Sequence, residues 1–300
     1  PTGWGPVAAP GLGVDAVLLL MGSDGAAGPA LPFGGSGEDR ATSVAADAGL
    51  VFVGGTFSAS VDFDPGPFPN SLTSVGAADA FLASFTVDGL FRWVGAFGGT
   101  TEDQISRNGL STTDDGFVLV AGWFTGSVDL DPGPGLATAE TKGQEDLFVL
   151  RFDAFGTLVE GFTLGGTGRD IALRAVEDAT GELAVIGTFT ASLDFDPGPG
   201  SSAITPLGSG GATDAFVARY DVTGALRWAR RFGDVLVGES SLTTPFGLAF
   251  DSSGRTVVSG RFFGNMDVDP GVGTRVLSSL GGADGFLLRL TAAGDLATSQ

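Results

Sequence analysis

Asp62-Phe-Asp-Pro-Gly-Pro67 organises this 300-residue sequence, because the chain contains the same six-residue pattern four times. The other copies are Asp129-Leu-Asp-Pro-Gly-Pro134, Asp194-Phe-Asp-Pro-Gly-Pro199 and Asp267-Val-Asp-Pro-Gly-Val272. A second mark, an aspartate that opens an apolar segment, follows each copy at Asp79, Asp146, Asp214 and Asp284. It lies 15 residues after the last motif aspartate in three copies and 18 in the third. Such regular self-similarity indicates a repeat architecture.

A third mark is a Gly-Gly or Gly-Asp pair whose first residue lies 19 residues beyond the second mark, at Gly98, Gly165 and Gly233. Asp15 and Gly34 have the same separation, which indicates a half-repeat before the first motif. The sequence therefore predicts a single domain, 1–300. It divides into a half-repeat (1–35) and four repeats of about 65 residues, at about 36–99, 100–166, 167–234 and 235–300.

Each repeat has the pattern of four short strands. In the first repeat they fall at 41–46, 50–57, 80–85 and 91–97, separated by turns such as Asp47-Ala-Gly49 and by the motif-containing loop. No segment sustains the 3.6-residue period of a helix. The fold class is therefore predicted as all-β. Four-stranded antiparallel units are typical of β-propeller blades, so we expect a β-propeller that is either five-bladed or part of a larger ring.

The composition excludes several classes of partner. The formal net charge is −20 and Lys142 is the single lysine, so nucleic acid is not expected as a partner. The apolar run Ala16–Met21 is too short to span a bilayer, so no membrane insertion is expected. The chain begins at Pro1, which indicates a processed product or an excerpt of a longer protein.

The absence of cysteine and histidine limits the chemistry that this chain can perform. Triads that use His or Cys and the usual zinc sites are excluded. Hydrolysis by two carboxylates needs neither residue, so a carboxylate-dependent carbohydrate-active enzyme is the alternative function. Because the acids recur in every repeat and active sites are usually singular, we predict that the protein is not an enzyme.

The recurring aspartates suggest calcium sites. The two motif aspartates project to the same side of an extended segment, the Pro-Gly turn can direct carbonyls at the same ion, and the aspartate of the second mark can return from the other arm of the loop. The candidate ligands are Asp62, Asp64, Asp79, Asp129, Asp131, Asp146, Asp194, Asp196, Asp214, Asp267, Asp269 and Asp284. The alternative is that the motif aspartates accept backbone N–H groups in a tight turn. The pattern is consistent with both.

Other recurring side chains have structural and functional interpretations. Trp93 and Trp228 occupy equivalent positions and either pack between repeats or form a platform for a glycan. Trp123 replaces a threonine of the other repeats and is expected to fill a gap. Arg151, Arg219 and Arg289 recur near the end of the third strand and are expected to pair with acids in the turns.

Residues 211–234 carry a resemblance to a known family. Asp-Ala-Phe-Val-Ala-Arg-Tyr-Asp at 214–221 and Leu-Arg-Trp-Ala-Arg-Arg-Phe-Gly at 226–233 resemble the bacterial SBBP-type β-propeller repeats. The resemblance extends over about 15–295 and implies an extracellular or cell-surface protein, from a family in which many members have no known activity. From it we expect an exported bacterial scaffold that binds or displays a protein or glycan ligand. The Asp-x-Asp-Pro-Gly insertions and a repeat count below seven depart from the family pattern.

Overall fold

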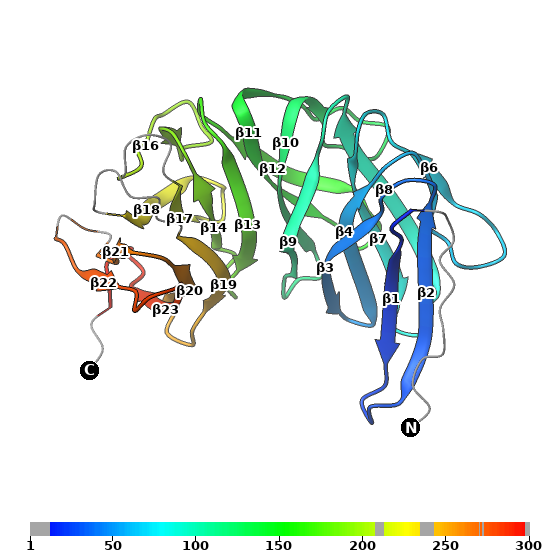
Figure 1. The fold of residues 1–300 in the computed structure, drawn as a ribbon. Coiled ribbons are helices and arrows are strands. Elements are labelled where there is room, and N and C mark those ends of the chain that lie inside the picture. Colours follow the sequence, from blue (N-terminus) through cyan, green and yellow to red (C-terminus); the bar gives the residue numbers. More distant parts are fainter. Residues whose placement is uncertain (1–12, 208–212, 235–242, 270, 272, 298–300) are drawn as a thin grey trace. The chain divides into compact units, whose positions relative to one another are not determined.

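Every regular element in the described part of the chain is a β-strand (Figure 1). The computed structural model describes residues 13–207, 213–234, 243–269, 271 and 273–297. The all-β prediction is confirmed. Among these residues, no helix has the length and apolar character needed to cross a membrane.

The chain divides into two compact units, which are described separately here. Unit 1 comprises Pro1–Val120, Phe124–Glu140 and Leu150–Gly161, and unit 2 comprises Ala121–Trp123, Thr141–Val149 and Phe162–Gln300. The division passes through the second repeat. The single domain over 1–300 stays a prediction.

The first repeat is an antiparallel sheet of four strands joined in chain order. They are β3 (Arg40–Asp47), β4 (Leu50–Phe57), β7 (Asp79–Thr86) and β8 (Phe91–Gly99). The half-repeat before it is a hairpin of β1 (Ala16–Met21) and β2 (Ala27–Gly35). Turn glycines with positive φ, such as Gly49 at 83° between β3 and β4, provide the left-handed conformation that the tight turns need.

The later repeats follow the same order. The second consists of β9 (Gln104–Thr112), β10 (Val118–Asp129), β11 (Thr138–Phe152) and β12 (Leu158–Leu164). The third consists of β13 (Asp170–Glu177), β14 (Leu183–Phe189), β17 (Asp214–Tyr220) and β18 (Leu226–Asp234). The fourth has β19 (Thr244–Phe250), β20 (Thr256–Phe262) and β23 (Asp284–Leu290), followed by one isolated bridge, Leu290↔Leu296.

The motif insertion is a hairpin, whereas the sequence indicated a loop. The short pairs are β5 (Ser60–Asp62) with β6 (Ser71–Thr73), β15 (Leu193–Asp194) with β16 (Ala203–Ile204), and β21 (Asn265–Asp267) with β22 (Val276–Ser278). In the second repeat the long strands β10 and β11 extend into the insertion. We call these four insertions the clasp hairpins, because three of them pair with the last strand of the preceding repeat. The pairs are Gly34↔Asp62, Gly98↔Asp129 and Gly233↔Asp267.

Apolar side chains fill the space between successive sheets. In unit 1, Phe33 of β2 belongs to the same buried cluster as Phe81 of β7 and Phe63 of the first motif. In unit 2, Ile186 of β14 belongs to a cluster with Leu248 of β19 and Phe286 of β23. Packing on both faces explains the nearly continuous apolar runs of the central strands. No sheet closes on itself within the described residues, and an arrangement of the sheets around a common axis stays a prediction.

Candidate functional site

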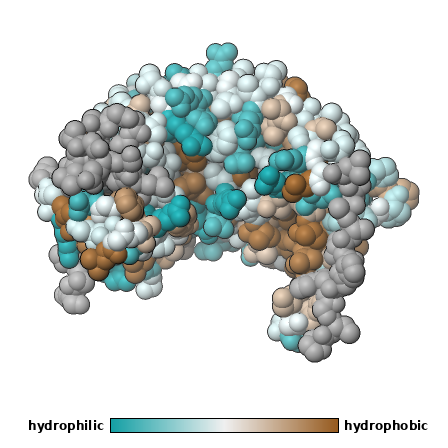
Figure 2. All heavy atoms as spheres, in the orientation of Figure 1, coloured by the Kyte–Doolittle hydropathy of each residue, from teal (hydrophilic) through white to brown (hydrophobic). Residues whose placement is uncertain are grey.

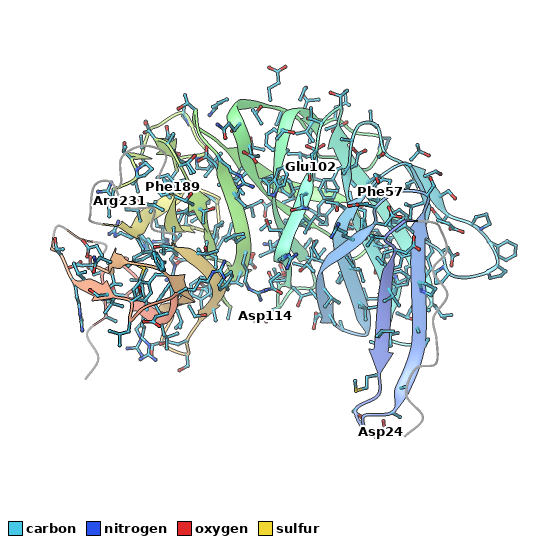
Figure 3. All side chains as sticks on the ribbon, viewed as in Figure 1. Asp24, Phe57, Glu102, Asp114, Phe189 and Arg231 are labelled. Carbon is cyan, nitrogen blue, oxygen red and sulfur yellow. The ribbon has the colours of Figure 1, made fainter. Side chains whose placement is uncertain are left out.

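The middle residue of each Asp-x-Asp-Pro-Gly motif anchors the clasp hairpin in the core. Phe63, Leu130, Phe195 and Val268 are all buried. Phe63 contacts Phe57 edge-on, with ring centroids 5.4 Å apart, and Phe195 contacts Phe189 in the same way at 5.9 Å. Phe57 and Phe189 end equivalent strands of the first and third repeats (Figure 3). The alternation of polar and apolar residues in the motif therefore places the two aspartates on the opposite side from this anchor.

The first motif aspartate caps the clasp hairpin in every repeat. Asp62 Oδ1 accepts the N–H groups of Asp64 at 3.1 Å and Asn70 at 2.8 Å. The equivalent donors are Asp131 and Ala137 for Asp129, Asp196 and Ser202 for Asp194, and Asp269 and Arg275 for Asp267. One carboxylate oxygen thus holds both arms of the hairpin together.

The second motif aspartate closes the Pro-Gly turn. Asp64 Oδ1 accepts the Gly66 N–H group at 2.8 Å. The same bond forms from Gly133 to Asp131, from Gly198 to Asp196 and from Gly271 to Asp269. This is the turn role that the sequence left open as the alternative to calcium.

The aspartates of the second mark lie at the start of the third strand, and we call them the strand-three aspartates. Asp79 accepts the Val75 N–H group at 2.8 Å, and Asp146 accepts the Lys142 N–H group at 2.9 Å. Asp214 and Asp284 accept from Leu207 and Leu280. The donor is four residues upstream in three repeats and seven upstream in the third, where the spacing from the motif is three residues longer. These carboxylates therefore organise the chain that leads into the strand.

Another set of aspartates precedes or opens the first strand of a repeat, and we call Asp39, Asp103 and Asp170 the junction aspartates. All three are buried. Asp103 accepts the Gly99 N–H group of the preceding repeat at 2.6 Å and the Thr125 N–H group of its own repeat at 3.3 Å. Asp39 joins Gly35 to Ser58 in the same manner. These aspartates were not among the predicted ligands, although the spacing Gly-x-x-x-x-Asp at Gly34, Gly98 and Gly165 marks them in the sequence.

The glycine pairs are required because strand-three and junction aspartates converge on them. A Cβ atom on Gly98 would lie 2.8 Å from Asp79 Oδ1 and 2.9 Å from Asp103 Oδ2. At the next junction a Cβ atom on Gly165 would lie 1.9 Å from Asp146 Oδ2, and the Gly166 N–H group donates to Asp170 at 2.7 Å. Two carboxylates from successive repeats therefore approach the same stretch of backbone.

Burial determines the protonation of these pairs. Burial raises the pKa of Asp103 to about 7, although hydrogen bonds from the Gly99 and Thr125 N–H groups lower it. The negative charge of Asp79 raises it further. Burial likewise raises the pKa of Asp170 to about 7, and the charges of Asp146 and Glu145 contribute. Burial also raises the pKa values of Asp39, Asp79 and Asp146.

The structure does not gather the predicted ligands into sets of three. Among the residues that the structure describes, no group of three or more His, Cys, Asp or Glu side chains could hold a metal ion. The two motif aspartates lie together in each clasp hairpin, and one oxygen of each accepts backbone N–H groups. The strand-three aspartates face the junction aspartates, not a motif pair, in the first two full repeats.

The repeated tryptophans pack between repeats. Trp93 Nε1 donates to the Ala154 carbonyl of the next repeat at 3.0 Å, and Trp228 Nε1 donates to Ala292 at 2.9 Å. Each ring covers a turn glycine, Gly156 or Gly294, where a Cβ atom would approach the ring to within 3 Å. These contacts favour packing over a glycan platform. Trp123 is buried, as expected of a residue that fills a gap.

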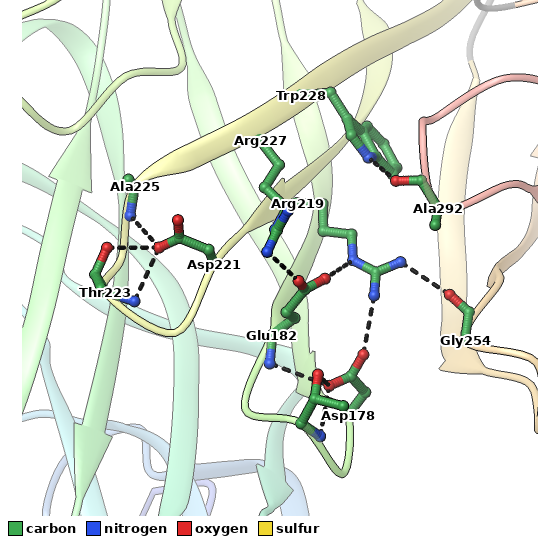
Figure 4. Close-up of polar contacts among 11 residues, drawn as sticks. Asp178, Glu182, Arg219, Asp221, Thr223, Ala225, Arg227, Trp228, Gly254 and Ala292 are labelled. Atoms are coloured by element: carbon green, nitrogen blue, oxygen red, sulfur yellow. Dashed lines mark hydrogen bonds and ion pairs between the residues drawn. The ribbon is translucent and has the colours of Figure 1, made fainter.

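The recurring arginines bind acids of the turn between the first and second strands, as predicted. Arg151 contacts Asp115 at 2.7 Å, and Arg289 contacts Asp251 at 3.5 Å. Arg219 is only 4% exposed and pairs with Asp178 at 2.9 Å and Glu182 at 2.7 Å (Figure 4). It also donates to the Gly254 carbonyl of the fourth repeat at 2.9 Å. Arg219 therefore joins the third repeat to the fourth.

Comparisons with known proteins assign no family to this chain. No family model matches the sequence. The regulatory protein FlaEY of Caulobacter vibrioides is 27% identical over 236 residues, which cover 75% of this chain and 23% of that protein. The chain thus spans about a quarter of the length of this curated relative. A crystal structure of a protein of unknown function from Bacteroides caccae aligns with 84% of this chain and 61% of its own, at 14% identity and a TM-score of 0.36.

Proposed function

We propose that the chain is a non-catalytic β-propeller scaffold, of the SBBP type, that binds or displays a ligand on the surface of a bacterial cell. The clasp hairpins carry this proposal. Each of three clasp hairpins adds strand pairs to the preceding repeat, so the repeats are linked by backbone hydrogen bonds as well as by apolar packing. An array linked in this way suits a rigid support for variable surface loops.

The tips of the clasp hairpins are the surfaces offered for display. Phe68 is 78% exposed and Leu136 is 82% exposed, although both follow motifs whose middle residues are fully or almost fully buried. Hydrophilic and hydrophobic residues are interspersed on the face that Figure 2 shows. Exposed apolar side chains at loop tips are available for contact with a protein or glycan partner.

An insertion experiment tests the display role. A short peptide epitope inserted between Phe68 and Pro69 should leave the melting temperature within about 2 °C of the wild type, because it only lengthens the loop that the hydrogen bond from Asn70 to Asp62 closes. The same insertion between Gly49 and Leu50, inside a tight β-turn, serves as the destabilising control. A large loss of stability from the tip insertion would contradict the proposal.

The proposal treats calcium at the motif loops as an additional stabiliser. The motif aspartates provide two carboxylates in each loop, and Ca²⁺ takes six to eight oxygen ligands. Asp64→Asn should then reduce any rise in melting temperature that 1 mM Ca²⁺ produces. The turn role alone predicts no such change.

The carbohydrate-active alternative is tested by substitution at equivalent positions. A hydrolysis screen on polysaccharides should detect no turnover. If turnover were found and were abolished by replacing an aspartate in one repeat only, the scaffold proposal would be wrong. The same aspartate geometry recurs in successive repeats, which is the observation that favours a structural role.

A further inference from the structure

Two buried pairs of carboxylates lie at the junctions between successive repeats. Asp79 and Asp103 are 2% and 0% exposed and converge on Gly98. Asp146 and Asp170 are also 2% and 0% exposed and lie against Gly165 and Gly166. Each pair combines a strand-three aspartate of one repeat with the junction aspartate of the next. Neither pair belongs to a motif loop.

Both pairs contain buried oxygen atoms that no group satisfies. Oδ1 of Asp79, of Asp146 and of Asp170 has no hydrogen-bond partner. Within the described ranges, none of these four carboxylates takes part in an ion pair, although the charge of Lys142 lies close enough to act on Asp146 and Asp170. A buried carboxylate oxygen without a partner is costly, and a second carboxylate nearby increases that cost.

The chemistry of the pairs matches a hard divalent cation. All the side-chain donors are carboxylate oxygens, and the sequence contains no His or Cys that would favour a transition metal. Backbone carbonyls lie at the same junctions: those of Gly99 and Thr100 pack against Gly76, and those of Gly166 and Thr167 pack against Gly143. A pair of carboxylates carries the charge that one Ca²⁺ ion neutralises, and calcium accepts carboxylate and carbonyl ligands together.

We propose that one Ca²⁺ ion binds between Asp79 and Asp103 and a second between Asp146 and Asp170, so that each ion joins two repeats. Both sites differ from the motif loops, which hold their own aspartates in turns. The proposal depends on the junction geometry and does not depend on the display role.

The junction between the third and fourth repeats is an internal control. Asp214 occupies the strand-three position there and lies against Gly233. Thr243 directly precedes the first strand of the fourth repeat, at the register position that Asp39 has in the first repeat. Thr243 is 1% exposed, so its place is as buried as that of Asp103. Among the residues that the structure describes at this junction, Asp214 is therefore the one buried carboxylate at these two positions.

Calorimetric titration with CaCl₂ and thermal melting at pH 7.5, on protein stripped with chelator, test the proposal. Wild-type protein should bind Ca²⁺ with a Kd on the order of 10⁻⁴ M, and 1 mM Ca²⁺ should raise the melting temperature by roughly 5 °C. The variant with Asp103→Asn and Asp170→Asn should bind two fewer ions and lose most of this rise. The matched motif variant, Asp131→Asn with Asp196→Asn, should still bind both junction ions, although it would lose any part of the rise that calcium at its motif loops contributes.

A gain of binding provides a test that does not depend on the stability of the double variant. Thr243→Asp should add one bound Ca²⁺ ion and increase the calcium-dependent rise in melting temperature. The proposal is overturned if wild-type protein binds no calcium, or if the motif variant loses binding while the junction variant keeps it. The proposal is also overturned if the junction variant is more stable than wild type in chelator and calcium changes the melting temperature of neither protein. That result would mean that the two carboxylates share a proton in place of a cation.

Discussion

The junction aspartates and the first motif aspartates both accept hydrogen bonds from backbone N–H groups, but the junction aspartates do so in the buried interior and the motif aspartates in a clasp hairpin. Asp103 and Asp129 each accept two backbone N–H groups through carboxylate oxygens. Asp103 is fully buried at a junction, and burial raises its pKa. At Asp194, a motif aspartate, burial raises the pKa, but the N–H groups of Ser202 and Asp196, the Ser201 side chain and the charge of Lys142 together lower it below its usual value. The comparison shows that two backbone N–H groups do not keep the pKa low where the carboxylate is fully buried beside another acid, as Asp103 is.

The largest expected effect is at the glycine between the paired carboxylates. Gly165→Ala should destabilise the fold by about 3 kcal/mol, because its Cβ atom would overlap the buried Asp146 carboxylate. Urea denaturation measures the loss. Gly282→Ala is the matched control, since no atom lies within 4 Å of its Cβ position, and it should change stability by less than about 0.5 kcal/mol. Equal effects of the two changes would contradict the crowded geometry at Gly165.

Removal of the carboxylates gives the direct test of the comparison. Asp103→Ala leaves the Gly99 and Thr125 N–H groups without an acceptor at a buried junction and should cost about 2–4 kcal/mol. Asp129→Ala frees the Asp131 and Ala137 N–H groups where water can reach them, so about 1 kcal/mol is expected. Denaturant melts of the two variants measure the difference. A loss at Asp129 as large as that at Asp103 would remove the distinction between the two sets.

The two sets should also differ in their response to pH. The pKa of Asp103 and of Asp170 is about 7 in the folded protein, above the usual value of 3.8, so the folded state binds more protons than the unfolded state between these values. In metal-free buffer, the contribution of Asp103 and Asp170 to the free energy of unfolding should therefore be greatest below pH 4 to 5. It should fall as the pH rises through 7. Melting temperatures from pH 5 to 8 measure this trend.

The pH trend has its own control. The Asp103→Asn and Asp170→Asn variant should lose the fall above pH 5, because its amides do not titrate. Asp194 has the opposite sign: its lowered pKa contributes stability that is present above pH 4 and is lost as the pH falls below that value. A wild-type protein whose stability is constant from pH 5 to 8 would show that these junction carboxylates are charged throughout.

The smallest effect on stability is expected from a substitution at Asp64 that keeps a side-chain oxygen to accept the hydrogen bond of the turn. Asn at position 64 retains a carbonyl oxygen for the Gly66 N–H group, so Asp64→Asn should change metal-free stability by less than about 0.5 kcal/mol. Thermal melting in chelator measures it. A loss of more than about 1 kcal/mol would mean that the motif carboxylates contribute through charge as well as through the turn.

The sequence predicted the local structure well because its marks are local. The four-strand pattern, the turn glycines and the arginine–acid pairs of Arg151, Arg219 and Arg289 depend on neighbours within one repeat or on a fixed register. The turn role of Asp62 and Asp64 was one of two interpretations, and the N–H donors that favour it lie within eight residues. Short-range rules are sufficient for such features.

The pairing of each clasp hairpin with the preceding repeat could not be predicted in this way. The partners Gly34 and Asp62 are close only after two repeats have packed together, and nothing in either segment specifies the other. The convergence of Asp79 and Asp103 on Gly98 has the same cause. The constant spacing from the glycine pair to the junction aspartate was visible, but its burial depends on tertiary packing.

The backward pairing of the clasp hairpins gives the array a direction. At three junctions in the described part of the chain, the end of the last strand is covered by residues that follow it in the chain, as β2 is covered by β5. During synthesis, a finished sheet would therefore keep an open edge until the following hairpin emerged from the ribosome and closed it. Assembly should then proceed from the first repeat to the last, and each repeat would protect its predecessor from pairing with the wrong chain.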